Sequence, residues 1–173
     1  MTIEQMQLII SAIADGFERS VAECLEVNRG AVVDVVQEQL WSGVDGTGKH
    51  LSPNYDNDPF FNEPGYWYKR NADYKEWKRQ ITPPSSMTIL ALPPRPDNIP
   101  NLFIDGTFYS GIEARMTGKE LEVYSSKGNG PAIADKYGNA IFDMGERGIG
   151  YFNATFLMPW IEDYFAKCGY TSA

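Results

Sequence analysis

The sequence predicts an α+β fold in which a small antiparallel sheet packs against the first and last helices of one domain. Apolar residues recur every three or four positions near both ends of the chain, a spacing typical of amphipathic helices. Around residue 118, apolar and polar residues alternate on both sides of a Gly-containing turn, which predicts a β-hairpin. Long stretches rich in Gly, Pro, Asn and Asp separate these runs and predict loops. The length of 173 residues favours a single domain, residues 1–173.

Residues 2–41 are predicted to be helical. Thr2 and Gln5 have the spacing of a capping box, in which each side chain satisfies a backbone N–H at the helix start. A stripe of apolar residues follows, and we expect it to be buried: Ile3, Met6, Ile10, Ile13, Phe17, Val21 and Cys24. Residues 28–30 predict a break, with Gly30 as a left-handed C-cap. The Val-rich stretch 31–41 continues as a helix that packing must stabilise.

The middle of the chain is predicted to be one helix between two long loops. Residues 42–65 form a loop, because Gly, Pro, Asn and Asp recur every few positions. Residues 66–81 form a helix whose Lys and Arg side chains face water. One stripe of this helix is expected in the core: Trp67, Tyr74, Trp77 and Ile81. Residues 82–101 contain six of the 11 prolines and run extended, because proline lacks an N–H donor and cannot continue a helix.

Residues 102–126 are predicted to form the hairpin, with strands between about 108 and 126. Small or apolar residues alternate with the others from Phe108 to Met116 and again around Leu121. The turn is expected at Thr117-Gly118-Lys119. This hairpin is the only sheet that the sequence predicts.

Residues 131–168 are predicted to be helical. Pro131 suits the first turn of a short helix that ends near Gly138. A last helix follows from about residue 146 to 167, where Pro159 predicts a kink and Gly169 predicts the end.

The charge of the chain is acidic and unevenly distributed. It carries 15 Lys and Arg against 23 Asp and Glu, a net charge of −8, which argues against a protein that coats nucleic acid. The first 40 residues have a net charge of −5, whereas residues 66–81 have a net charge of +3. These complementary regions predict head-to-tail association of identical copies into a ring.

Further classes of protein are excluded by composition. No run approaches the ~18–20 apolar residues of a membrane span, and the first residues lack the basic region of a signal peptide, so we expect no membrane association and a protein made in the cytoplasm. Cys24 and Cys168 are the only cysteines and have no His or Cys near them at ligand spacing, which excludes a zinc ribbon and a disulfide scaffold, because each needs clustered Cys or Cys/His sets. Whether the two cysteines approach each other stays open.

The motifs that could carry chemistry are better explained as turns. Residues 43–50 nearly match the phosphate-binding loop G-x-x-x-x-G-K-S/T, but His50 stands at the hydroxyl position and the segment follows a helix instead of a strand. His50 is also the only histidine, and Asp105-Gly106-Thr107 reads as an Asp-Gly turn. Asp56 and Asp58 lack the spacing of a calcium loop. We therefore predict no catalytic residues, no metal and no cofactor.

Aromatic residues make up 13% of the chain and gather in the loops and in residues 66–81. Rigid aromatic loops suit interfaces with other subunits. The candidate assembly-interface residues are Tyr55, Phe60, Phe61, Trp67, Tyr68, Lys69, Arg70 and Arg95.

Two other functions remain open. One is a small carbohydrate-binding or cell-wall-active protein that stacks sugars on Trp41, Trp67 or Trp160, with Asp56, Asp58 and Glu63 as possible hydrolytic carboxylates. The other is single-stranded nucleic-acid binding by the interleaved rings and bases of residues 66–79.

The order of segments over residues 35–165 resembles that of short proteins encoded by tailed phages and prophages. The stretches that carry the resemblance are 39–45, 48–49, 51–55, 58–61, 74–78, 81–83, 100–106, 136–138 and 141–142. The same order is similar, more distantly, to the tail-completion and virion-morphogenesis proteins of the phage neck. The corresponding motifs here are Leu51-Ser52-Pro53 and the stretch 103–112, with Gly111 and the Pro-rich segment as departures from the pattern.

The resemblance implies a structural virion protein. In that family such a chain forms an oligomeric ring at the head–tail junction, as a neck, connector or tail-completion component. Its implied partners are further copies of itself and other neck, portal or tail proteins. The resemblance implies assembly in the host cytoplasm and carries no catalytic residues.

Overall fold

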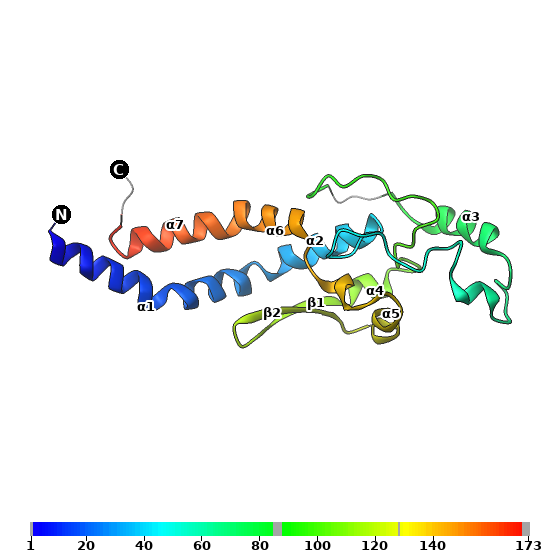
Figure 1. Cartoon of the computed structure of the whole chain (residues 1–173), viewed down its shortest axis with the longest axis horizontal. Coiled ribbons are helices and arrows are strands. Elements are labelled where there is room, and N and C mark those ends of the chain that lie inside the picture. Colours follow the sequence, from blue (N-terminus) through cyan, green and yellow to red (C-terminus); the bar gives the residue numbers. More distant parts are fainter. Residues whose placement is uncertain (1, 85–87, 128, 171–173) are drawn as a thin grey trace.

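The computed structural model describes residues 2–84, 88–127 and 129–170 of the chain (Figure 1). It confirms an α+β fold in which helices predominate and the described residues form one two-stranded antiparallel sheet. In chain order the elements are α1 (Ile3–Val27), α2 (Arg29–Trp41), the 3-10 helix η1 (Pro59–Asn62), α3 (Asn71–Ile81), α4 (Thr107–Ser110), β1 (Ile112–Thr117), β2 (Glu120–Ser125), α5 (Gly130–Tyr137), the 3-10 helix η2 (Asn139–Phe142), α6 (Glu146–Phe152), the π-helical turn η3 (Asn153–Leu157) and α7 (Met158–Lys167).

The molecule is elongated and has three regions (Figure 1). The arm consists of α1 with η3 and α7, and both ends of the chain lie at its tip. The body consists of α2, the β-hairpin, α4, α5, η2 and α6. The head consists of residues 53–82, which include η1 and α3, and it lies at the end opposite the arm tip.

The arm is an antiparallel pair of helices. The predicted capping box is confirmed, since Thr2 and Gln5 exchange hydrogen bonds of 2.8 and 3.2 Å. The Tyr164 hydroxyl of α7 donates to the carbonyl oxygens of Ala12 and Ile13 at 3.0 and 2.9 Å. The helical run from residue 146 to 167 widens into η3 just before Pro159, which accommodates the proline without ending the run.

The apolar stripe predicted to be buried along α1 is largely exposed. Ile3, Met6 and Ile10 leave 78%, 47% and 59% of their surface exposed, and of the stripe only Cys24 is fully buried. The reason is geometric: α7 covers one face of α1, and no third described element covers the neighbouring face. The prediction for Gly30 is also wrong. The break lies at Asn28, whose side chain donates to the Cys24 carbonyl at 2.9 Å, and Gly30 lies within α2.

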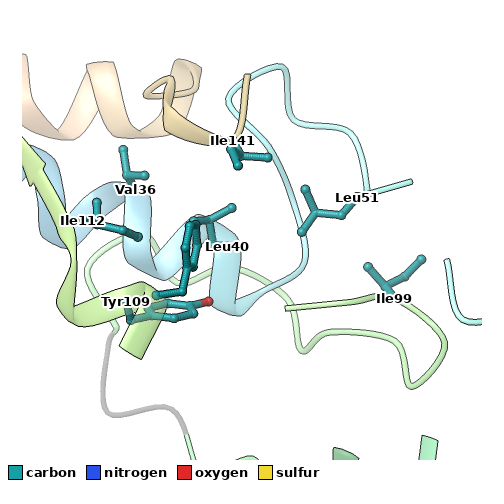
Figure 2. Close-up of a cluster of buried hydrophobic side chains, with 8 residues drawn as sticks. Val36, Leu40, Leu51, Ile99, Tyr109, Ile112 and Ile141 are labelled. Carbon is teal, nitrogen blue, oxygen red and sulfur yellow. The ribbon is translucent and has the colours of Figure 1, made fainter. Parts of the chain in front are cut away.

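The hydrophobic core surrounds α2. Figure 2 shows Val36 and Leu40 of α2 among apolar side chains from five separate segments. The other members of this core are Leu51, Ile99, Phe108, Tyr109, Ile112 and Ile141. Packing therefore stabilises this Val-rich helix, as expected. Gly148 allows α6 to approach α2, because a Cβ there would lie 2.4 Å from Cγ1 of Val35.

The hairpin is shorter than predicted. β1 and β2 pair from Ile112↔Ser125 to Thr117↔Glu120, and Gly118 has the positive φ of 66° that the tight turn requires. The residues from Phe108 to Ser110 are helical instead of extended. Phe108 and Tyr109 are both buried, and two successive residues of a strand could not face the same core. The hairpin packs mainly on α2. Of the C-terminal helices, α6 packs on α2 and α7 packs on α1.

The other expected boundaries are close to the observed ones. α5 begins with Pro131 in its first turn and is followed by Gly138 at a φ of 86°. Gly169, at a φ of 94°, follows the end of α7. The helix predicted at 66–81 starts only at Asn71, because Lys69 adopts a left-handed φ of 52° and its N–H bonds to the Phe61 carbonyl at 2.8 Å.

The described residues of the proline-rich segment form no helix or strand, and Glu38 of α2 holds the segment against the body. The buried Glu38 carboxylate accepts the backbone N–H groups of Ile89 and Leu90 at 2.7 and 2.9 Å. A carboxylate is suited to this because both of its oxygens are acceptors. Residues 85–87 of the segment lie outside the described residues.

The Glu38→Gln variant tests this anchor. We expect it to lower the free energy of unfolding by about 1–3 kcal/mol, because the amide nitrogen cannot accept one of the two N–H groups. Urea unfolding would measure the change. Asp34→Asn is the matched control, since Asp34 lies one turn earlier on α2 and is exposed. An equal loss in both variants would contradict an anchoring role for Glu38.

Candidate interaction surfaces

The head is organised by a cluster of aromatic side chains. The Tyr74 ring of α3 lies at the centre, with the rings of Tyr55, Phe61, Trp67 and Trp77 between 5.0 and 5.3 Å from it. Most of these pairs have the tilted or edge-to-face geometry that aromatic rings prefer. Tyr55 and Phe61 are buried, with 4% and 6% of their surface exposed. These two predicted interface residues therefore support the head from within.

The outside of the cluster forms an exposed patch. Phe60 and Tyr68 expose 42% and 45% of their surface, and Tyr66 exposes 72%. The Lys69 ammonium lies 5.1 Å from the Tyr68 ring, and the Arg70 guanidinium lies 4.7 Å from the Tyr66 ring. We call these five residues the head patch. The sequence-based set omitted Tyr66, although it belongs to the same run of rings and bases.

The basic charge of the head is largely paired within the chain. Lys75 contacts Asp56 at 2.7 Å, and Arg70 contacts Asp73 at 2.8 Å. Arg79 pairs with Asp97 at 2.8 Å, and the aspartate comes from the proline-rich segment. The free basic face expected of residues 66–81 is therefore much weaker than their net charge suggests.

Lys78 departs furthest from the expectation that basic residues face water. It exposes only 1% of its surface, and its ammonium donates to the Asn101 side-chain oxygen at 3.0 Å and to the Phe103 carbonyl. Desolvation, together with the nearby Arg95 charge, lowers the pKa of Lys78 from 10.5 to about 7. The amine thus links α3 to residues 101–103.

Arg95, another predicted interface residue, is half-buried. Its guanidinium donates to the carbonyl oxygens of Pro96 and Ile99, so it closes the turn in its own loop. It therefore stabilises the segment that carries Asn101. The structure does not bring Arg95 into the head patch through any of these contacts.

The arm carries two different grooves. The first, which we call the apolar groove, has a volume of about 280 Å³ and is lined by Met6, Ile9, Ile10, Ile13, Phe165 and Tyr170. The second has a volume of about 510 Å³ and includes Asp15, Arg19, Glu23, Asp163 and Lys167 in its lining. The two sets of α1 residues lie on different faces of the helix, because side chains at i, i+3 and i+4 share a face. Sequence patterning identified the apolar stripe but placed it in the core.

Of the three carboxylates considered for hydrolysis, Asp56 and Asp58 have structural partners, and Asp56 pairs with Lys75 at 2.7 Å. Asp58 is buried, accepts the Phe60 N–H at 3.0 Å and pairs with Lys136 at 2.6 Å. Asp45 accepts the backbone N–H groups of Thr47 and Lys49, which is turn chemistry. Within residues 2–84, 88–127 and 129–170, no group of three or more His, Cys, Asp or Glu side chains could hold a metal ion.

The tryptophans considered as sugar platforms pack against their own chain. The Trp41 ring meets Phe103 and Tyr109 edge-on at 5.0 and 5.6 Å. The Trp160 indole N–H donates to the Ser20 hydroxyl at 3.0 Å in the arm. Trp67 lies between Tyr66 and Trp77 in the head. Each of the three rings thus has a contact within its own chain and stays partly exposed.

Comparison of the chain with protein-family models, curated proteins and solved structures finds no match. In the described part of the chain, no helix is long and apolar enough to cross a membrane. Cys24 and Cys168 are both free thiols. Function is therefore inferred from the head patch, the arm and the sequence patterns.

The buried Lys78 predicts a pH dependence of stability. The folded state binds fewer protons than the unfolded state between the pKa of about 7 in the fold and the ordinary value of 10.5, so stability rises with pH in this window. We expect the free energy of unfolding to increase by about 2–3 kcal/mol between pH 7 and pH 9.5. Above pH ~10 the gain reverses, because burial raises the pKa of Tyr55 and Tyr109 in the folded state.

Urea unfolding at several pH values measures this effect. Lys78→Met should remove the rise, whereas Lys75→Met, which alters a surface ion pair, should retain it. A wild-type stability that stays flat over this pH range would show that the Lys78 amine keeps its proton in the fold.

Proposed function

We propose that the chain is a structural virion protein of a tailed bacteriophage, which assembles as a homo-oligomeric ring at the head–tail junction. The observation that carries the proposal is the elongated shape (Figure 1), which has the apolar groove of the arm toward one end and the head patch toward the other. In this role the protein has no catalytic residues, cofactor or metal, and its partners are its own copies and other neck, portal or tail proteins.

The exposed apolar residues of the arm support an assembly role. Soluble monomers scatter such residues singly, and a contiguous apolar surface marks an interaction site. Ile3, Met6 and Ile10 lie along one side of a single helix, so their exposed surfaces are contiguous. Covering them requires another molecule.

The head patch supports contact with a second partner. Tyr, Trp and Arg are the residue types enriched at the centres of interfaces. Here the exposed ring of Tyr66 packs against Trp67 of the aromatic cluster, so little conformational entropy of that side chain would be lost on binding. A ring needs at least two contact regions per copy, and the arm and the head patch can supply them.

The resemblance to phage neck proteins supplies the biological setting. The order of elements agrees with what it implies: an N-terminal helix, a loop, a turn into a hairpin and a closing helix. The departure at Gly111 has a local cause, because a Cβ there would lie 2.6 Å from Cβ and 2.7 Å from the backbone nitrogen of Lys127. The extra glycine thus allows residue 127 to cross the start of β1.

Two measurements test the proposal. Purified particles of the phage or prophage that encodes the chain should contain it in a fixed copy number, by mass spectrometry. The isolated protein should form a defined oligomer by size-exclusion chromatography with light scattering. Absence from complete virions would reject the proposed role.

A variant of the head patch tests its part in assembly. Replacing Tyr66 and Tyr68 with Ser should reduce incorporation into virions at least tenfold while changing the free energy of unfolding by less than about 1 kcal/mol, because both rings are exposed. Val27→Ser is the control, since Val27 exposes 69% of its surface at the base of the arm. Equal incorporation of the Tyr66/Tyr68 variant and wild type would exclude the patch from the contact.

A further inference from the structure

Most of the large apolar side chains that the described residues expose lie in the arm. α7 covers α1 through Ser20, Ala12 and Ile13, and this contact leaves Met6 and Ile10 beside an open groove. Phe165 of α7 and Tyr170, which follows that helix, line the other side of the groove. A pair of helices cannot bury apolar stripes as wide as these, because each stripe extends beyond the line of contact between the two helices.

The charged residues of the arm are kept away from the apolar groove. Asp15, Arg19 and Glu23 line the polar groove instead, and Glu18 pairs with Lys119 of the β-hairpin turn. None of the residues that line the apolar groove is charged. Two such grooves could therefore face each other without bringing like charges into contact, even though α1 as a whole is acidic.

We propose that the apolar groove binds the arm of a second copy of this chain, so that two α1–α7 pairs form a four-helix bundle. Helical stripes are covered well by other helices, whose side chains interdigitate with them. A two-fold contact uses the same surface on both copies, and an uncharged apolar groove is self-complementary in this sense. The inference rests on the self-association in the proposed function and assigns one of its contacts to the arm; a two-fold contact alone gives a dimer, so a ring uses a second contact region as well.

The size of the arm fits a stable contact. α1 has 25 residues, which corresponds to a length of about 37 Å, and a pair of helices is about 20 Å wide. One whole face of the arm thus has a projected area of about 700 Å², close to the ~800 Å² per partner of a standard interface, and the apolar groove at residues 6–13 of α1 is part of that face.

Other occupants fit the groove less well. An anionic membrane surface would be repelled by Glu4, Asp15 and Glu23, which have no ion-pair partner among the described residues. The head of another copy offers little free positive charge, since Arg70 and Lys75 pair within their own chain. A second arm can bind without electrostatic attraction, because burial of apolar surface alone favours the contact.

The experiment compares the self-association of three full-length proteins: wild type, the double variant Met6→Glu/Ile10→Glu, and Leu8→Glu. Light scattering over a concentration series gives the association constant of each. We expect the double variant to associate about 100-fold more weakly or worse, because two acidic groups would be buried in the bundle. Leu8→Glu is the matched control, with the same change on the same helix at a residue that is 72% exposed and does not line the groove. It should stay within about threefold of wild type.

Circular dichroism shows whether the double variant is folded. If it is not, the single variant Ile10→Glu gives the same readout, because Ile10 lines the groove and is already 59% exposed, so its replacement disturbs the fold less. A wild type that remains monomeric at ~100 µM overturns the inference, since a standard interface associates far below that concentration. An equal loss of association in Leu8→Glu also overturns it.

The results separate the inference from the proposed function. If wild type and the double variant associate equally, the arm inference fails while an assembly role through another surface stands. If the chain is absent from virions but its arm variants lose association, the virion role fails and the arm contact stands.

Discussion

The burial of α2 is the constraint on which the rest of the structure depends. Val36 and Leu40 contribute to the core, while polar side chains of the same helix bind the backbone of distant segments. Gln39 donates to the Asp143 carbonyl at 3.0 Å and accepts the Gly145 N–H at 2.8 Å. Gln37 donates to the Tyr109 carbonyl at 3.0 Å, and Glu38 holds the proline-rich segment. A helix buried on several sides thus satisfies backbone groups of loops that have few partners of their own.

The body, the head and the arm therefore differ in how completely they bury their apolar residues. The body buries its apolar residues around α2, and the head does so around Tyr74. The arm extends beyond the body as two helices only, so one of its faces stays uncovered. An assembly protein can use such a division, because the body has a buried core of its own while the arm and the head patch expose apolar and aromatic side chains.

The charged residues are also arranged differently in the head and in the arm. Most basic residues of α3 pair inside the head, and Lys78 is enclosed among neutral acceptors. The acidic residues of α1 lie outside the apolar groove. Electrostatic attraction between the ends of neighbouring copies is thus weaker than the net charges of −5 and +3 suggest. Apolar and aromatic surfaces are the stronger basis for association.

Local patterns in the sequence determined most of the elements. The capping box at Thr2, the turn at Gly118 and the start of α5 at Pro131 depend on neighbours a few residues away, so the chain itself specifies them. Periodicity also identified the stripe of α1, but only tertiary structure decided that it is uncovered, because burial depends on how many elements surround a helix. The same holds for the enclosure of Lys78 and the inward position of Tyr55 and Phe61. Their surroundings come from segments far away in the sequence, which no local pattern encodes.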